Sequence, residues 1–192
     1  MGFWYNESMV FIIPGLTIRK EFYYSLRNKI KKAGLHAEII DLGLNTESLE
    51  DSSEKVFQRI KKSSYKNDII AHSFGGVIIR YLIKHRPEVK DKIKSIIFVS
   101  VPHRGSLSAL FASIFPAARD LLPFRKKLNT LSRVSLPKAV VNFVPEIELK
   151  IWPKKGEIMK NCENIVIPET NHDSIIKSNN FTKEAIAFIK SN

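Results

Sequence analysis

Short apolar segments alternate with helical segments along this chain of 192 residues. Such alternation predicts a mostly parallel sheet with helices on both faces, and functional groups in the loops at the carboxyl ends of the strands. Asn45 or Thr46 is expected to cap the helix after the second strand. We therefore expect a single α/β domain over residues 1–192, with a sheet of about six strands: 9–13, 37–40, 69–72, 94–100, 139–144 and 164–167.

The third expected strand leads directly into a serine that is followed by two glycines. Residues 69–72 end at Ser73, Gly75 and Gly76 follow, and an apolar helix continues from there. A strand–turn–helix of this kind lifts the serine hydroxyl above the end of the strand, and glycines let the helix pass close by. The pattern is Gly-x-Ser-x-Gly with Ala71 in the first position. It predicts that Ser73 is a catalytic nucleophile on a nucleophile elbow.

A serine hydroxyl needs a base that removes its proton during attack, and the histidines are the candidates. His172 lies in the loop after the last expected strand, on the same rim as Ser73, and we expect it to be this base. His72 adjoins the serine and is expected to point away and to pack or hydrogen bond locally. His103 follows the fourth expected strand; we expect it to brace its loop, with contact to substrate as the alternative.

The third member of a catalytic triad is a carboxylate that orients the histidine, and in this fold it lies between the serine and the histidine in the chain. No aspartate occurs from residue 121 to residue 172, so the acid is expected to be a glutamate. We expect Glu148, in the loop after the fifth strand, with Glu146 and then Glu157 as alternatives. Either loop glutamate could instead be a solvated surface charge.

An oxyanion hole needs two backbone N–H groups directed at the developing negative oxygen. Phe74, the residue after the serine, is expected to supply one of them. Pro14-Gly15-Leu16 follows the first strand, and Leu16 N–H is expected to be the second donor. Gly15 would permit a close approach of the backbone. The alternative interpretation of Pro-Gly is a simple turn after a strand.

Residues 107–124 depart from the strand–helix alternation. This segment is rich in Leu, Ile and Phe but is interrupted by Pro116 and Pro123. Part of it follows the carboxyl end of a strand and should lie near the serine. We weigh two interpretations, an apolar lid or acyl-binding wall and an ordinary helix packed on the sheet, and both can hold for different halves.

The formal charge of +12 at pH 7 favours anionic partners. The basic residues are spread along helices and are not interleaved with aromatic residues, so nucleic acid is not the expected partner. A solvated basic surface is the simplest interpretation, and an anionic membrane surface is the preferred functional one. No apolar run approaches the roughly 20 residues of a transmembrane helix.

Cysteine usage bears on the compartment of the protein. Cys162 is the single cysteine, which excludes an internal disulfide, and no Cys/His cluster has the spacing of a zinc site. The first residues lack the features of a signal peptide. We expect a cytoplasmic protein, peripheral to a membrane where it meets one, without a structural metal; a secreted mature form is the alternative.

These motifs together resemble the α/β-hydrolase superfamily, and more narrowly its minimal single-domain bacterial lipases and esterases. The resemblance rests on Ala-His-Ser-Phe-Gly-Gly at 71–76, Pro-Gly-Leu at 14–16 and residues 164–172. Val-Pro-His-Arg-Gly-Ser at 101–106 is similar to the Thr-Pro-His-x-Gly-Ser of many lipases. Glu-Leu-Lys-Ile at 148–151 stands where the family has Asp-x-x-Val, a departure that bears on the acid.

The resemblance implies hydrolysis of carboxylic esters through an acyl-enzyme, without a cofactor. Ser73 would attack the ester carbonyl, His172 would transfer the proton, and Glu148 would orient His172. The apolar segment 107–124 favours an apolar acyl ester as substrate. Two alternatives are kept open. One is a thioesterase or acyltransferase with the same triad, and the other is a non-catalytic basic protein that binds anionic membranes.

Overall fold

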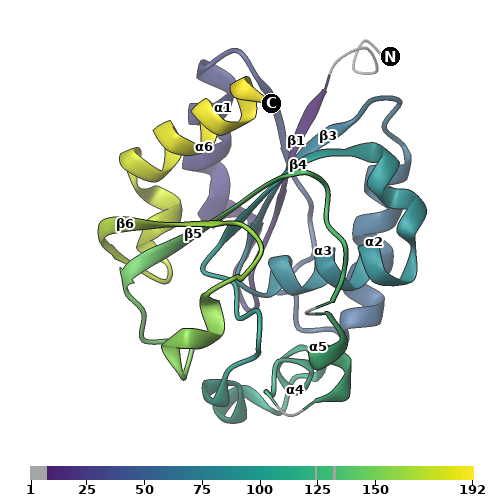
Figure 1. Ribbon diagram of the computed structural model, residues 1–192, viewed down its shortest axis with the longest axis vertical. Helices are drawn as coiled ribbons and strands as arrows, with labels where there is room; N and C mark the ends of the chain where they lie inside the picture. Colours follow the sequence, from purple (N-terminus) through teal and green to yellow (C-terminus); the bar gives the residue numbers. More distant parts are fainter. Residues whose placement is uncertain (1–7, 124, 132) are drawn as a thin grey trace.

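The computed structural model describes residues 8–123, 125–131 and 133–192. Six strands form one sheet in the order β2-β1-β3-β4-β5-β6, and all neighbouring strands run parallel (Figure 1). This confirms the predicted α/β class and sheet. The strands are β1 (Met9–Ile13), β2 (His36–Ile39), β3 (Asn67–His72), β4 (Ile93–Val99), β5 (Ala139–Ile147) and β6 (Glu163–Asn171).

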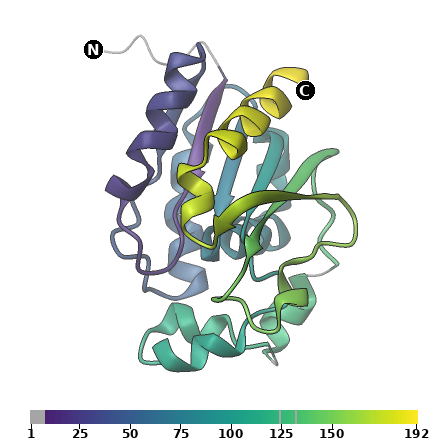
Figure 2. The same ribbon diagram turned by 90° about the vertical axis from the view of Figure 1, so that its left-hand side faces the viewer.

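Helices cover both faces of this sheet. Helices α1 (Tyr24–Lys32) and α6 (Asn179–Ser191) lie side by side on one face, as Figure 2 shows, while α2 (Leu49–Lys61) and α3 (Phe74–His85) cover the other. Strand β1 explains how both faces become buried, because successive side chains of a strand point to opposite faces. Val10 and Ile12 pack in the cluster with α1 and α6, whereas Phe11 and Ile13 pack in the cluster with α2 and α3.

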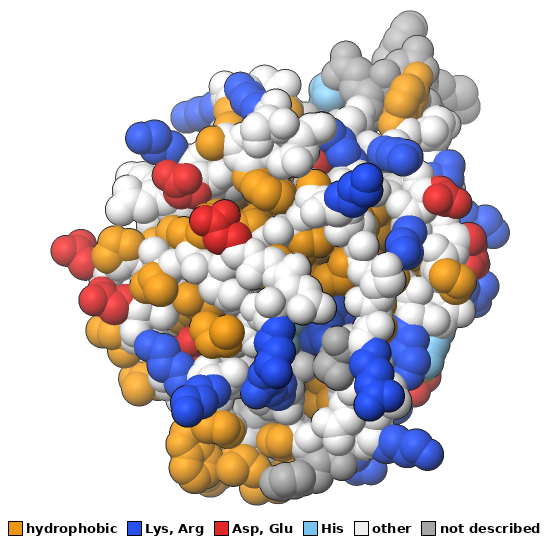
Figure 3. Space-filling model, viewed as in Figure 1, with side chains coloured by type: hydrophobic (Ala, Val, Ile, Leu, Met, Phe, Trp, Pro, Cys, Tyr) orange, Lys and Arg blue, Asp and Glu red, His pale blue; other side chains and the backbone are white. Residues whose placement is uncertain are grey.

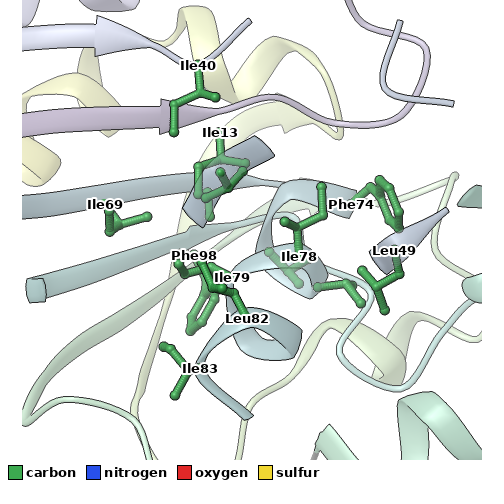
Figure 4. Packing of buried hydrophobic residues seen from close by; sticks show 14 of the residues in the cluster. Ile13, Ile40, Leu49, Ile69, Phe74, Ile78, Ile79, Leu82, Ile83 and Phe98 are labelled. Carbon is green, nitrogen blue, oxygen red and sulfur yellow. The ribbon is translucent and has the colours of Figure 1, made fainter. Parts of the chain in front are cut away.

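The cluster on the α2 and α3 face holds the start of α3 in place. In Figure 4, Leu82 and Ile83 of α3 lie toward Phe98 of β4, whereas Phe74 lies on the side of Leu49 of α2. Phe74 and Ile78 are fully buried. Burying such a side chain contributes roughly 1.5–3 kcal/mol. The packing therefore fixes the residues that begin α3, next to Ser73.

The start of α2 differs from the sequence prediction. Ser48 is the N-cap, and its Oγ accepts a hydrogen bond from Asp51 N at 3.1 Å. The N-cap expected at Asn45 or Thr46 is wrong, because Asn45 serves a long-range contact instead. Its Nδ2 donates to the carbonyl oxygen of Pro14 at 2.9 Å and so fixes the loop that follows β1.

The segment expected to be a lid or a packed helix divides at Pro116. In its first half, η3 (Leu107–Ala112) and the residues that follow leave Leu110, Phe111 and Ile114 exposed, with Phe111 at 96%. In its second half, α4 (Pro116–Asp120) is followed by a turn, and its apolar side chains pack on the core: Ala117, Ala118 and Leu121. Phe124, the last residue of the predicted segment, lies outside the described residues.

Short elements complete the chain. They are η1 (Lys20–Tyr23), η2 (Pro87–Lys92), α5 (Lys126–Leu131), η4 (Lys154–Glu157) and η5 (Ser174–Lys177). Within the described ranges, no helix is both long enough and apolar enough to cross a bilayer. Residues 1–7, on which the signal-peptide prediction rests, are not among those described.

Gly75 offers a stability test of the tight packing at the start of α3. A Cβ here would lie 2.8 Å from the Pro14 carbonyl oxygen and would overlap the Ile13 carbonyl oxygen, which are backbone atoms. Gly75→Ala should therefore lower the free energy of unfolding by about 3 kcal/mol or more, although alanine normally favours a helix. Gly34→Ala is the matched control, because its Cβ meets nothing within 4 Å and it bears only the strain of φ +84°. Urea denaturation of both variants checks this, and equal losses would contradict the packing argument.

Candidate active site

Ser73 occupies the sharp turn between β3 and α3. Its backbone angles, φ 50° and ψ −119°, are unusual for a residue with a side chain, and the turn is held by Ser73 N, which donates to the Val99 carbonyl oxygen at 2.9 Å. Gly75 lies against the end of β1, and Gly76 lies against Val101, where a Cβ would overlap the valine side chain. The two close approaches are those that the glycines of the sequence predicted.

A chain of hydrogen bonds joins Ser73, His172 and Glu148. His172 Nδ1 lies 2.8 Å from Glu148 Oε2, and His172 Nε2 lies 3.0 Å from Ser73 Oγ. A carboxylate can only accept, so Nδ1 carries the proton and Nε2 accepts from the Ser73 hydroxyl. All three residues are buried, with exposed fractions of 9%, 5% and 8% in that order. The structure thus brings together the three predicted residues, from segments 24 to 99 positions apart.

Glu148 is fixed by the backbone that follows it. Its Oε1 accepts hydrogen bonds from Lys150 N at 2.7 Å and Ile151 N at 3.0 Å, which leaves Oε2 directed at His172. Glu146 is exposed, and its Oε2 accepts from the backbone N of Glu169. Glu146 thus lies in β5 and not in the loop after it, and Glu148 is the glutamate that contacts His172.

Glu157 is a second buried carboxyl near Glu148. Neither of its oxygens has a hydrogen-bond partner in the part of the chain that the structure describes. Burial raises the pKa of this carboxyl to about 7, and the negative charge of Glu148 acts in the same direction, while Lys154 opposes it. Glu157, the third candidate for the acid, therefore forms no hydrogen bond to His172.

The raised pKa of Glu157 predicts a pH-dependent loss of stability. A carboxyl whose folded pKa is above the unfolded value of 4.5 stabilises the fold fully below that value, and this contribution is lost as pH rises through 7. The free energy of unfolding of Glu157→Gln, relative to that of the native protein, should therefore rise by on the order of 2 kcal/mol from about pH 4 to pH 8. Urea denaturation at both pH values measures this difference, and a pH-independent difference would contradict the argument.

A second chain of hydrogen bonds supports the site from behind. Gly15 N donates to Tyr23 Oη at 2.9 Å, Tyr23 O–H donates to His72 Nδ1 at 2.8 Å, and His72 Nε2–H donates to the His172 carbonyl oxygen at 3.0 Å. Burial lowers the pKa of His72 to about 3, so its ring is neutral. The sequence suggested that His72 points away from the site. It points toward the site instead, because the His172 carbonyl oxygen is the acceptor for its Nε2–H. Nothing in the sequence marked Tyr23 for this position.

Two backbone N–H groups near Ser73 are left available. Gly15 N donates to Tyr23, and Thr17 N donates to the Leu44 carbonyl oxygen, whereas Leu16 N and Phe74 N have no acceptor among the described residues. The loop lies against the serine, since a Cβ on Gly15 would be 3.1 Å from Ser73 Cβ. Both predicted oxyanion donors are therefore free.

The possibility of a metal at this site can be tested by its donor atoms. Ligand atoms of His72, His172 and Asp173 lie within 4.8 Å of one another. Both nitrogens of each histidine already have partners, as described above. A metal would have to displace these partners, so the cluster does not fit a resident metal.

The six-stranded parallel sheet and the serine at the strand–helix turn define an α/β-hydrolase. Residues 48–192, which include Ser73, Glu148 and His172, match the family of lecithin:cholesterol acyltransferase. The chain belongs to this family. A search of curated protein sequences finds no match.

Solved structures share the fold at low sequence identity. The lipase BlEst2 of Bacillus licheniformis in its mature form superposes with a TM-score of 0.76 at 16% identity, covering 95% of this chain and 91% of that one. Aspergillus fumigatus lipase B superposes with a TM-score of 0.74 at 14% identity, covering 86% of this chain and 47% of that one. The monoacylglycerol lipase of Paleococcus ferrophilus superposes with a TM-score of 0.66 at 15% identity, covering 95% of this chain and 92% of that one. These comparisons confirm the predicted resemblance to bacterial lipases in fold.

Proposed function

We propose that this protein is a serine hydrolase that cleaves carboxylic esters through an acyl-enzyme on Ser73. The observation that carries the proposal is the chain of hydrogen bonds from Ser73 through His172 to Glu148. Membership of an acyltransferase family supports the coarser statement, a hydrolase or acyltransferase. The strained turn at Ser73 supports it as well, because such strain is characteristic of functional sites.

Each group has a defined role in the proposed reaction. Ser73 Oγ attacks the ester carbonyl carbon while its proton passes to His172 Nε2, and Glu148 stabilises the resulting imidazolium. The N–H groups of Leu16 and Phe74 hold the negative oxygen of the tetrahedral intermediate. The C–O bond to the leaving group then breaks, and His172 returns the proton to the departing alcohol. Water, activated by the same histidine, releases the acid and restores Ser73.

The surface beside the site supports an apolar acyl group. Leu110, Phe111 and Ile114 in the first half of the 107–123 segment are exposed, and so are Leu149 and Trp152 in the loop after Glu148. Two hydrogen bonds join these segments: Leu107 N donates to the Trp152 carbonyl oxygen, and Trp152 N donates to Ser106 Oγ, both at 2.8 Å. Figure 3 shows hydrophobic side chains gathered at the lower end of the molecule, near α4. We assign this exposed half of the segment as the acyl-binding wall, within one domain.

An acyltransferase is the second candidate. The matching family carries that activity in its name, and an acyl-enzyme on Ser73 can pass its acyl group to an alcohol as well as to water. A thioesterase would use the same residues with a thiol as leaving group. These reactions share the first half of the mechanism and differ in what enters or leaves, so the products distinguish them.

The proposed partners are the acyl ester and an anionic membrane surface. Lys and Arg side chains outnumber Asp and Glu on the face in Figure 3, in line with the formal charge of +12. Such a surface attracts anionic lipid within a Debye length. We propose a cytoplasmic enzyme that meets the membrane peripherally. Co-sedimentation with anionic and with neutral vesicles tests this, and equal binding to both would contradict it.

The test of function is hydrolysis of p-nitrophenyl esters of increasing acyl length, with and without an added alcohol. The proposal predicts activity that Ser73→Ala removes and that rises from acetate to longer acyl chains. Phe111→Ser should reduce the preference for longer chains and leave acetate hydrolysis unchanged. Formation of a new ester with the alcohol would favour the acyltransferase. Activity that equals that of Ser73→Ala on all esters and thioesters would overturn the proposal.

A further inference from the structure

A cavity of about 720 Å³ lies away from the Ser73 site. It opens between α3, α5 and the segments that precede β5 and β6, and neither Ser73, His172 nor Glu148 lines it. The volume is that of a small-molecule site, which typically measures about 300–1,000 Å³. Half of the lining residues are apolar, among them Leu128, Val134, Leu136, Val140, Ile158 and Met159.

Arg80 provides a buried positive charge to this cavity. Arg80 lies on α3, is only 3% exposed, and lines the cavity. Nη1 donates to His103 Nδ1 at 3.0 Å and to the His103 carbonyl oxygen at 3.1 Å, which makes His103 the loop brace that the sequence predicted. Nε is buried without a hydrogen-bond partner, and no carboxylate among the described residues pairs with Arg80.

The absence of a counter-charge near Arg80 is unusual because a buried cation is costly unless it is paired. Burial lowers the pKa of the guanidinium to about 10, which leaves it charged at neutral pH. His103, its main partner, is neutral and only accepts through Nδ1, because Nε2–H donates to Asn142 Oδ1. The guanidinium therefore retains donors for an anion.

The remaining charges around the cavity have the same sign. Arg104, Lys138 and Lys160 line it, and no Asp or Glu does among the described residues. A lining that is half apolar, with basic residues and one buried guanidinium, is complementary to a molecule with an apolar chain and an anionic head. A planar carboxylate matches the fork of an arginine, and its single charge matches the single buried cation.

We propose that this cavity binds the carboxylate of an amphipathic acid, with the head group on Arg80 and the chain along the apolar wall. The site is distinct from Ser73: Arg80 is seven positions further along α3, which corresponds to about 10 Å along the helix axis. The proposal does not depend on the proposed function, because it requires no reaction at Ser73. Failure of either one leaves the other unaffected.

Isothermal titration with decanoate, decyl phosphate and decanol tests the proposal. We expect decanoate to bind at this site and decanol to bind at least about tenfold more weakly, because the alcohol lacks the charge that pairs with Arg80. Decanol that binds as tightly as decanoate would overturn the proposal. Tighter binding of decyl phosphate than of decanoate would overturn the assignment of a carboxylate.

Variants locate the binding. Arg80→Gln removes the charge, and Leu136→Trp fills the cavity while keeping Arg80, so that a folding defect in the first variant does not decide the result. Both should weaken decanoate binding at least about tenfold. Lys183→Glu, an exposed charge reversal on α6 outside both sites, is the control and should bind as the native protein does. Native affinity in Leu136→Trp, or an equal loss in Lys183→Glu, would contradict this location.

Discussion

Replacing Ser73 with alanine is expected to lower kcat/KM for a p-nitrophenyl ester by about 10⁴-fold or more. The alanine cannot form the acyl-enzyme, and only the oxyanion donors and substrate binding remain to assist attack by water. His172→Ala should cause a loss of similar size because the serine then lacks its base. Since the two residues act as a unit, the double variant should be no slower than either single variant.

The stability of these variants provides the control for this prediction. Ser73→Ala retains the strained φ of 50° and should unfold at nearly the native temperature, whereas glycine adopts such angles freely. Ser73→Gly should therefore be inactive and more stable than Ser73→Ala by about 1–2 kcal/mol. Esterase assays and thermal unfolding measure both effects. Full activity in either variant, or additive losses in the double variant, would contradict the assigned roles.

Glu148→Ala should lower kcat/KM by about 10²–10⁴-fold, because the histidine loses the group that fixes its tautomer and stabilises its positive charge. The effect is expected to be smaller than that of Ser73→Ala, since a neutral His172 can still accept the proton. Glu146→Ala is the matched control. It removes a carboxylate two residues away whose partner is the backbone N of Glu169, and the activity should change by less than about threefold.

The same assay with both glutamate variants decides between the two carboxylates. A large loss in Glu146→Ala with native activity in Glu148→Ala would show that the loop rearranges and that the observed contact is not the functional one. Equal large losses would indicate that the loop as a whole, rather than the carboxylate on His172, supports catalysis. The hydrogen bond at 2.8 Å from His172 to Glu148 predicts neither result.

Local sequence patterns contain most of the information about this fold. Continuous apolar runs, such as residues 69–71 in β3 and 96–99 in β4, predict buried parallel strands, because helices cover both faces of such strands. The start of α2 was not predictable in the same way. Asn45 is a favourable N-cap residue by its chemistry. Its side chain, however, donates a hydrogen bond to the carbonyl oxygen of Pro14, which is 31 positions away.

The candidate site shows the same division between local and distant information. Ser73 and His172 follow strands of a parallel sheet, so chain order alone places both at one rim. The sequence favours Glu148 but leaves Glu146 as an alternative, because only the backbone N–H groups of Lys150 and Ile151 determine which carboxylate faces His172. The supporting contact from Tyr23 to His72 spans 49 positions and depends on how a helix packs against the sheet.

The most direct measurement of the central claim is covalent labelling by a fluorophosphonate ester. The account predicts that one equivalent reacts with the native protein, that peptide mapping by mass spectrometry places the adduct on Ser73, and that esterase activity falls in step with labelling. His172→Ala should label far more slowly, because the serine is no longer activated. An unlabelled Ser73 in a folded protein, or labelling at equal rates with and without His172, would contradict the claim that Ser73 is an activated nucleophile.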